Sequence, residues 1–156
     1  LTKMHDKGLI SSMGFYKKVK NELGLKINFG EFASFWNEIF FENKLVTALL
    51  KKIKKNYRLL LLSNTNKLHF DYIKKKFDVI KLFDEIIVSY KAHALKPEAE
   101  IYEIAIKKAR THPKKILYTD DREDLVEAAR SVHGIDAVVF KNAEDLRRIL
   151  TEKTIL

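Results

Sequence analysis

From residue 57 onward, short apolar runs alternate with stretches of helical periodicity, and this alternation constrains the fold more than any other feature. The first run, "YRLLLLSN" at 57–64, is continuously apolar before it turns polar, which is typical of a strand buried on both faces. We expect strands at 57–64, 85–90, 114–119 and 136–140, and helices at 66–77, from Pro97 through Ala105, at 122–131 and at 142–152. Strands and helices that alternate at these lengths predict an α/β fold, a parallel sheet with helices on both faces.

Residues 11–55 carry no strand pattern and are predicted to be helical. Phe15, Val19 and Leu23 recur at helical spacing, and Gly24 follows as a C-cap. Asn28 then lies three residues before Glu31, as in a capping box. We therefore divide the chain into a helical part, 1–55, and an α/β part, 56–156.

The helix expected after Asn28 carries an aromatic stripe that has two interpretations. Such a stripe either faces a ligand or belongs to the core or a subdomain interface, and we favour the second. The stripe consists of Phe32, Phe35, Trp36, Ile39 and Phe40. A third helix is expected to carry Leu45, Val46, Leu49, Leu50 and Ile53.

Composition limits the class of protein. The 156 residues are 46% apolar and contain no cysteine, so disorder, disulfides and thiolate metal sites are all excluded. No apolar run reaches the length of a membrane span, and the first ten residues carry no secretory apolar segment, so we expect a cytoplasmic protein without a membrane partner.

The net charge of +9 comes from 30 Lys and Arg against 21 Asp and Glu, and it fits binding to polyanions. The lysines are spread in pairs and triples beside helical patterns, where they coat a solvated surface. No basic segment is interleaved with aromatic residues as in single-strand binders, so nucleic acid is an unlikely partner.

Polar residues follow three of the predicted strands. Ser63 and Asn64 end the first, Lys96 follows the second after a loop, and Asp120 with Asp121 ends the third. Because ligands bind at the carboxyl ends of strands in open α/β sheets, we expect these groups to converge on one edge. Ser63 and the backbone around Asn64 are suited to donate to phosphate oxygens, Lys96 to neutralise a phosphoryl group or a carboxylate, and the two aspartates to hold Mg²⁺.

Each of these groups also has an ordinary structural interpretation. Ser63 and Asn64 fit a strand-to-helix turn, Lys96 fits a surface lysine before a helix, and the aspartate pair fits a solvated turn that caps the next helix. Two adjacent carboxylates at a buried strand end repel each other, so the pair is either a solvated turn or lies beside a positive group, and a bound Mg²⁺ ion would offset the repulsion. The order of the three groups, each after a strand, favours a common site. His93, close to Lys96, is interpreted as a loop-surface residue rather than a substrate contact.

The motifs resemble those of the haloacid dehalogenase superfamily, which consists mostly of Mg²⁺-dependent phosphatases. The segments are "LLLLSNTNKLHFDYI", "VSYKAHALKPEAEIY" and "ILYTDDREDLVEAAR". Their sequences are most similar to those of the branch that contains the phosphatase domain of soluble epoxide hydrolase and the sugar-phosphate phosphatases. The resemblance implies that Lys96 is catalytic, that Ser63, Asn64 and Lys96 bind the substrate, and that Asp120 and Asp121 bind Mg²⁺. It also implies that residues 11–55 are the end of a helical cap, and that the substrate is a small phosphorylated metabolite hydrolysed through an aspartyl-phosphate.

Two departures from the family pattern affect this expectation. The first motif, Asp-x-Asp at the end of a central strand, does not occur in the chain, so the chain looks N-terminally shortened and is expected to be weakly active or inactive by itself. In the fourth motif Leu125 replaces an asparagine that often supports the metal, and Asp124 is the candidate to compensate. The alternatives are a non-catalytic phosphate-binding module and a basic nucleic-acid-binding protein. A homo-oligomer or a separate N-terminal segment would cover the exposed sheet edges.

Overall fold

The computed structural model describes the backbone of residues 1–156 and every side chain except that of Val132. The four predicted strands are present; three lie within their predicted segments, and the third along the chain extends one residue beyond its own, to Asp120. They are β1 Leu60–Ser63, β2 Glu85–Val88, β3 Leu117–Asp120 and β4 Asp136–Val139. The helices between and after them are α5 Lys67–Lys76, η1 Asp78–Leu82, α6 Ser89–Ala92, α7 Ala99–Ala109, η2 Pro113–Lys115, α8 Glu123–His133 and α9 Ala143–Glu152. The predicted α/β alternation is confirmed, although Pro97 lies in a turn two residues before α7 rather than in its first turn.

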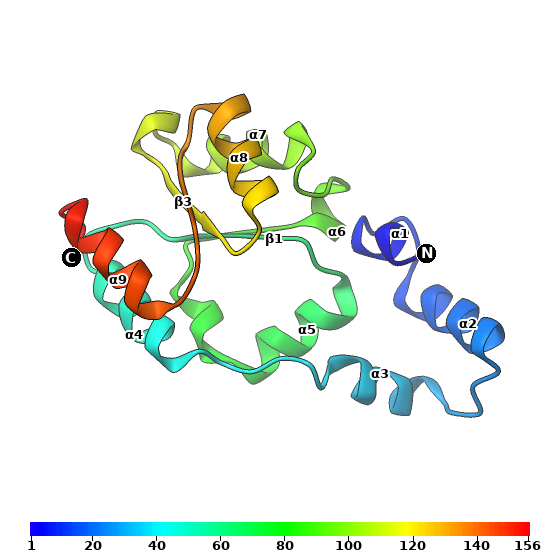
Figure 1. Cartoon of the computed structure of the whole chain (residues 1–156). Helices are drawn as coiled ribbons and strands as arrows, with labels where there is room; N and C mark the ends of the chain where they lie inside the picture. The colour runs from blue at the N-terminus through cyan, green and yellow to red at the C-terminus, as the bar shows by residue number, and fades with distance from the viewer.

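The strands form two parallel pairs rather than one sheet. β1 pairs with β2, with Leu60 opposite Glu85, and β3 pairs with β4, with Leu117 opposite Asp136. Within the described backbone, no strand pairing joins β1 to β3. Both pairs nevertheless share one apolar core, in which α7 and α8 pack over the strands (Figure 1). The core is centred on Ile87, Ala94, Ile101, Tyr102, Val126, Ala129, Ile135 and Ala137.

Among the described strands, β1 and β3 each have one edge that pairs with no strand, and at this edge backbone N–H and C=O groups point away from β2 and β4 respectively. Leu59 exchanges hydrogen bonds with Asp84 on the β2 side, since its N–H donates to the Asp84 carboxylate and its carbonyl accepts from the Asp84 N–H. Successive residues of a strand point their backbone groups to opposite sides, so those of Leu60 and Leu62 point to the unpaired edge. The carbonyl of Asp120 accepts from Phe140 on the β4 side, so the backbone groups of Thr119 point away from β4.

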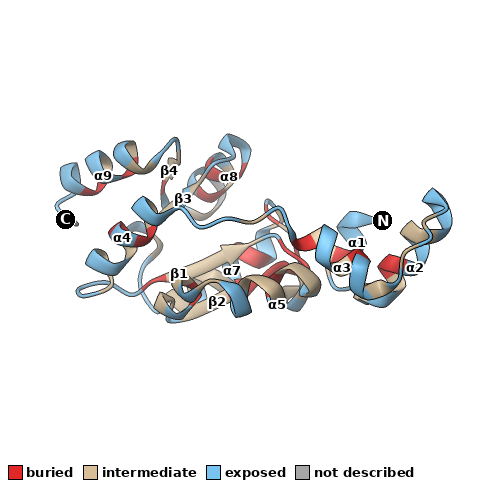
Figure 2. Ribbon diagram, turned by 90° about the horizontal axis from the view of Figure 1, so that it is seen from below, coloured by how far each residue is buried: buried red, intermediate tan, exposed pale blue. Residues whose placement is uncertain are grey.

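The N-terminal helices form a group of their own at the end of the molecule opposite to the C-terminus (Figures 1 and 2). They are α1 Thr2–Asp6, α2 Ser12–Leu23 and α3 Phe29–Asn37. Their small core is built around Phe15, Tyr16 and Phe32. Both predicted caps are confirmed: Gly24 ends α2 at a φ of 62°, and Asn28 and Glu31 form a reciprocal capping box at the start of α3.

The interpretation of the aromatic stripe as core or a subdomain interface holds for only part of it. α3 ends at Asn37, so the stripe does not continue on one helical face, and Phe35 and Ile39 are 66% and 62% exposed. Phe32 is buried, and the ring of Trp36 stacks on His69 of α5 at 5.8 Å. The stripe therefore forms an interface only where α3 meets α5.

The helix α4, Lys44–Ile53, packs with the α/β elements rather than with α1 to α3. Its Leu49 is buried against Leu146 and Leu150 of α9 (Figure 2). The division of the chain at residue 55 into a cap and a core stays a prediction. No helix among the described residues is long and apolar enough to cross a membrane.

Candidate active site

The centre of the candidate site is an ion pair between Lys96 and Asp120. The Nζ atom of Lys96 lies 2.5 Å from Oδ2 of Asp120, and each side chain is less than a tenth exposed. The same ammonium group donates to the carbonyl of Leu62 and to the hydroxyl of Tyr118, each at 3.2 Å. An ammonium group has three protons, so these three acceptors use all of them. Lys96 therefore links the carboxyl ends of β1 and β3.

The carboxylate of Asp120 is held by three donors. Oδ2 accepts from Lys96 and, at 2.6 Å, from the Tyr118 hydroxyl, whereas Oδ1 accepts from the backbone N–H of Arg122 at 3.0 Å. Burial by itself would raise the pKa of Asp120, but the hydrogen bonds from Lys96, Tyr118 and Arg122 outweigh it and hold the pKa below its ordinary value. Burial, together with the bond to Asp120, raises the pKa of Tyr118, so its hydroxyl keeps its proton. The question raised by the adjacent aspartates thus has an answer within the chain, because a buried ammonium group offsets the charge of one of them.

Asn64 positions Lys96 through its backbone. The Asn64 side chain accepts from the Lys96 N–H at 2.8 Å and donates to the Lys96 carbonyl at 3.0 Å. The pair fixes the loop that carries Lys96 beside the end of β1. Ser63, the last residue of β1, is half-buried, and within the described part of the chain its hydroxyl makes no side-chain hydrogen bond. Four of the five predicted residues, Ser63, Asn64, Lys96 and Asp120, therefore converge at the carboxyl ends of the strands.

The remaining acidic residues differ in how far they are available to a cation. Asp121 is exposed, and among the described residues it has no hydrogen-bonding or ion-pair partner. Asp124 is bound at both oxygens by the Arg122 guanidinium, at 3.0 and 2.5 Å, and Leu125 is buried in the core. The side chain of Asp124 is thus committed elsewhere, which is evidence against its compensating for Leu125.

The donor set suits Mg²⁺ in kind. Across the described side chains, no group of three or more His, Cys, Asp or Glu residues is placed to hold a metal ion. Mg²⁺ is usually bound through only one or two carboxylates, together with waters and substrate phosphate. Asp120 and Asp121 supply two such hard oxygen donors on adjacent residues, so the residues present fit this ion.

Two residues of the site were missed by the sequence analysis. Ser89, at the end of β2, is fully buried; its hydroxyl accepts from the Thr65 N–H and lies 2.7 Å from the Asp6 carbonyl, so it joins α1 to the strand ends. Tyr118 lies two residues before Asp120 and so shares its face of β3. The signal for Ser89 was a polar residue directly after an apolar strand, and the signal for Tyr118 was its period-2 spacing from Asp120. His93 is exposed and bonds the Lys7 carbonyl at 2.9 Å, so its prediction as a loop-surface residue is confirmed.

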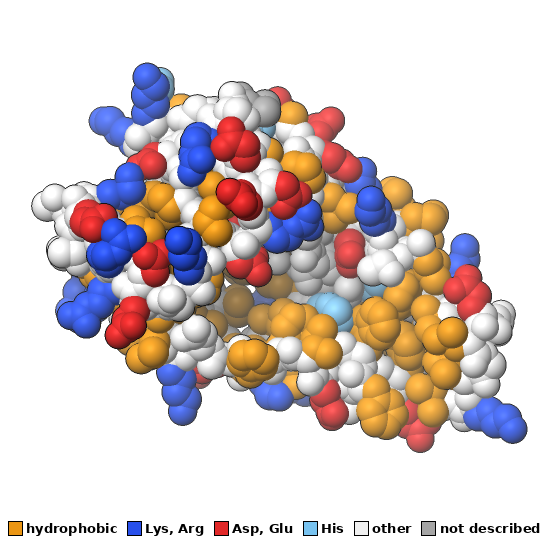
Figure 3. All heavy atoms as spheres, viewed as in Figure 1, with side chains coloured by type: hydrophobic (Ala, Val, Ile, Leu, Met, Phe, Trp, Pro, Cys, Tyr) orange, Lys and Arg blue, Asp and Glu red, His pale blue; other side chains and the backbone are white. Residues whose placement is uncertain are grey.

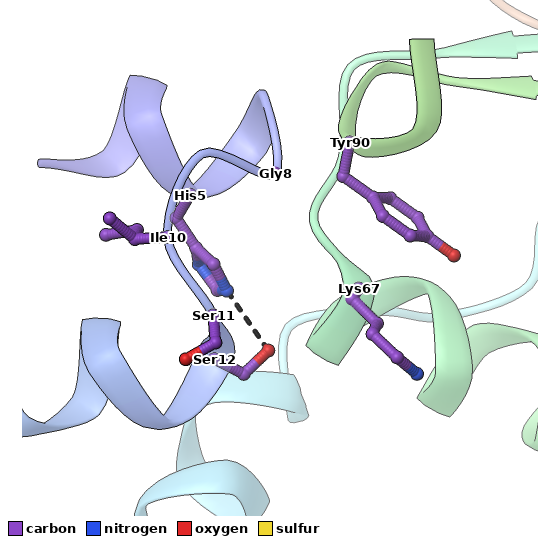
Figure 4. A pocket seen from close by; sticks show the side chains of 7 residues that line it. All are labelled: His5, Gly8, Ile10, Ser11, Ser12, Lys67 and Tyr90. Carbon is purple, nitrogen blue, oxygen red and sulfur yellow. Dashed lines mark hydrogen bonds between the residues drawn. The ribbon is translucent and has the colours of Figure 1, made fainter. Parts of the chain in front are cut away.

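A small cavity of about 150 Å³ lies where the turn between α1 and α2 meets α5 and α6 (Figure 4). His5 lines it and points its Nε2 atom at the Ser12 hydroxyl, 3.2 Å away, while Lys67 and Tyr90 close the opposite side. Burial lowers the pKa of His5, so this ring is held neutral at the junction. The cavity is separate from the Lys96–Asp120 pair, and none of the predicted site residues lines it.

The molecular surface supports the interpretation of the net charge as a solvated coat. On the face drawn in Figure 3, Lys and Arg side chains are scattered among acidic ones, and a hollow with apolar side chains at its floor lies between the upper and lower parts of the molecule. This face shows no continuous basic stripe of the kind expected for a nucleic-acid interface.

Comparison with known proteins places the chain in a family. Residues 16–133 match the haloacid dehalogenase-like hydrolases, and this range includes every residue of the site. The chain belongs to this hydrolase family. The resemblance of its motifs to that family is thereby confirmed, whereas the narrower branch and the shortened N-terminus stay predictions.

Several relatives of the hydrolase have names or solved structures. The chain is 24% identical over 153 residues to the D-ribitol-5-phosphate phosphatase of Bacteroides thetaiotaomicron, which covers 94% of the chain and 74% of the relative. It is 30% identical over 108 residues to the drimenol cyclase of Aspergillus calidoustus, which covers 67% of the chain but only 20% of that protein. A haloacid dehalogenase family enzyme of B. thetaiotaomicron superposes with a TM-score of 0.85 at 27% identity, over 94% of the chain and 75% of the enzyme. That enzyme has also been crystallised with magnesium and inorganic phosphate, a form with a TM-score of 0.82 at 28% identity over 88% of the chain and 73% of the enzyme. These neighbours confirm the α/β fold.

Proposed function

We propose that this chain is part of a Mg²⁺-dependent phosphatase that hydrolyses a small phosphorylated metabolite through an aspartyl-phosphate. The observation that carries the proposal is the buried Lys96–Asp120 pair at the carboxyl ends of β1 and β3, within a chain of this hydrolase family. The name of the phosphatase relative and the magnesium and phosphate complexes of the structural neighbour support it. D-ribitol 5-phosphate is therefore the first substrate to test, followed by other sugar and polyol phosphates.

The residues of the chain take distinct roles in this proposal. Lys96 supplies a fixed positive charge for the phosphoryl oxygens, and it reaches them by exchanging a neutral acceptor, the Leu62 carbonyl or the Tyr118 hydroxyl, for the phosphate. Ser63 donates its hydroxyl to the same group, and Asn64 keeps Lys96 in place. Asp120 and Asp121 would hold Mg²⁺, which when bound neutralises charge on the phosphoryl group.

We further propose that a fifth strand between β1 and β3 supplies the nucleophilic aspartate. Residues 1–156 contain no Asp-x-Asp sequence, and the edges of β1 and β3 are unpaired. The family resemblance implies a central strand that carries this motif. The helical part of the chain, 1–55, would then supply the cap over the completed site. By this proposal residues 1–156 alone bind ligand but turn over slowly or not at all.

The decisive experiment measures binding and turnover separately, on protein whose mass is verified at 18.2 kDa. We expect inorganic phosphate to bind in the presence of Mg²⁺, and the Lys96→Met variant to lose this binding while the exposed control Lys67→Met keeps it. Absence of phosphate binding by the wild-type chain would overturn the assignment. Rapid Mg²⁺-dependent release of phosphate from a substrate by the same chain would overturn only the proposal that a fifth strand supplies the nucleophile.

A non-catalytic phosphate-binding module is the second candidate. It is favoured by the absence of an Asp-x-Asp sequence from residues 1–156. The two candidates differ in their dependence on the cation: phosphate binding that Mg²⁺ tightens supports the phosphatase, and phosphate binding that Mg²⁺ leaves unchanged supports the module.

A further inference from the structure

Among the described residues, three donors use three of the acceptor positions of the Asp120 carboxylate. A carboxylate offers about four lone-pair positions, two on each oxygen. Lys96 and Tyr118 take both positions of Oδ2, and the Arg122 N–H takes one of Oδ1. The remaining position, on Oδ1, is the one that a cation can use without breaking an existing hydrogen bond.

The Tyr118 hydroxyl is held on Oδ2 by the packing of its ring as well as by its hydrogen bond. Its ring packs edge-on against Tyr102 with 6.0 Å between ring centres. Tyr102 is itself fully buried and is anchored by a 2.9 Å hydrogen bond from its hydroxyl to the Leu125 carbonyl. Lys96, in contrast, ends a flexible four-carbon side chain.

Lys96 and Tyr118, the two donors to Oδ2, also have different roles in the proposed function. Lys96 must turn toward a phosphoryl group, and in doing so it gives up the Leu62 carbonyl or the Tyr118 hydroxyl. Tyr118 has no such role toward the phosphoryl group, and its hydroxyl donates to Asp120 at 2.6 Å. When Lys96 turns, Tyr118 remains as the fixed donor that prevents the carboxylate from rotating.

We propose that Tyr118 is a positioning residue, which fixes Oδ2 of Asp120 and so presents Oδ1 to a Mg²⁺ ion. This inference rests on the proposed function, since it assigns Tyr118 to the same cation site. Partners that orient a ligating carboxylate typically change metal affinity by 10- to 100-fold when they are removed.

The test compares two tyrosine-to-phenylalanine variants of the full 156-residue chain. Tyr118→Phe removes the hydroxyl that donates to Asp120, and Tyr102→Phe removes a buried hydroxyl of the adjoining ring that donates to the Leu125 carbonyl. Both variants keep their rings, and thermal unfolding reports any loss of stability. The dissociation constant for Mg²⁺ is measured by titration calorimetry with magnesium chloride alone.

We expect Tyr118→Phe to weaken Mg²⁺ binding by about tenfold or more, and Tyr102→Phe to stay within about twofold of wild type. Equal affinity of Tyr118→Phe and wild type would overturn the positioning role and leave the phosphatase proposal intact. Equal weakening in both variants would assign the effect to the general fold, which also overturns the role. Wild-type protein that binds no Mg²⁺ would overturn this inference together with the metal dependence of the proposed function, although phosphate binding would still be measured separately.

Discussion

The ammonium group of Lys96 lies 2.5 Å from the carboxylate of Asp120, although the two residues are 24 positions apart, one in the loop after β2 and the other at the end of β3. Both side chains are almost completely buried, so water solvates neither charge well. Each charge therefore depends on the other, and on the Leu62 and Tyr118 oxygens around them. A change in either residue should therefore affect both the stability of the fold and the proposed binding of ligand.

Removal of the lysine charge should destabilise the fold strongly. In Lys96→Met the Asp120 carboxylate stays buried without its cation, and the loss of one partner of a buried pair costs about 3 kcal/mol or more. The free energy of unfolding in urea measures this loss. The control is Lys67→Met, which breaks an exposed pair with Asp71 and should change the stability far less. If both variants lost a similar free energy of unfolding, burial would not be what makes the Lys96–Asp120 pair contribute more than the exposed pair.

Acid should weaken the fold partly through Asp120. The pKa of Asp120 in the folded protein lies below that of an unfolded aspartate, which is about 3.9. Its contribution to stability is therefore fully present above the unfolded value and is lost as the pH falls through the folded value. The free energy of unfolding should thus decline less steeply below about pH 4 in Asp120→Asn than in wild type. Parallel curves for the two proteins would show that Asp120 does not titrate as inferred.

The junction between α1 and the core should be sensitive to a single added methyl group. Gly8 and Gly24 both have positive φ, of 70° and 62°, so an alanine at either position costs about 1 kcal/mol of backbone strain. A Cβ atom on Gly8 would also lie 2.3 Å from the Tyr90 carbonyl oxygen, whereas one on Gly24 meets nothing within 4 Å. We expect Gly8→Ala to lower the melting temperature clearly more than Gly24→Ala. Equal shifts would mean that the contact with Tyr90 yields without cost.

Asp121 and Asp124, two exposed aspartates after β3, should differ in their effect on Mg²⁺ binding. Asp121 is unpaired among the described side chains, whereas Asp124 has both oxygens bound to Arg122. Under the proposed function, Asp121→Asn should abolish most of the thermal stabilisation by Mg²⁺, and Asp124→Asn should keep it. A larger loss in Asp124→Asn would show that Arg122 releases Asp124 to the ion.

Much of the local structure follows from the sequence because its signals lie within a few residues of one another. The capping box of Asn28 and Glu31 and the C-cap at Gly24 depend only on backbone groups nearby, and both were predicted correctly. The same holds for the apolar run that becomes β1. The site residues were found because Ser63 and Asp120 each end a strand and Lys96 lies in the loop after β2.

The features that could not be predicted from the sequence depend on contacts between distant segments of the chain. The exposure of Phe35, the packing of α4 on α9 and the bond from Ser89 to Asp6, 83 residues away, have no local signal. The only sequence signal for Tyr118 was its period-2 spacing from Asp120. That spacing places it on the same face of β3 but does not show that Lys96 contacts both side chains. The sequence by itself therefore determined the elements and the groups at their ends. The packing of two separate strand pairs on one helical layer decided which of those groups meet, because that packing alone brings the ends of β1 and β3 together.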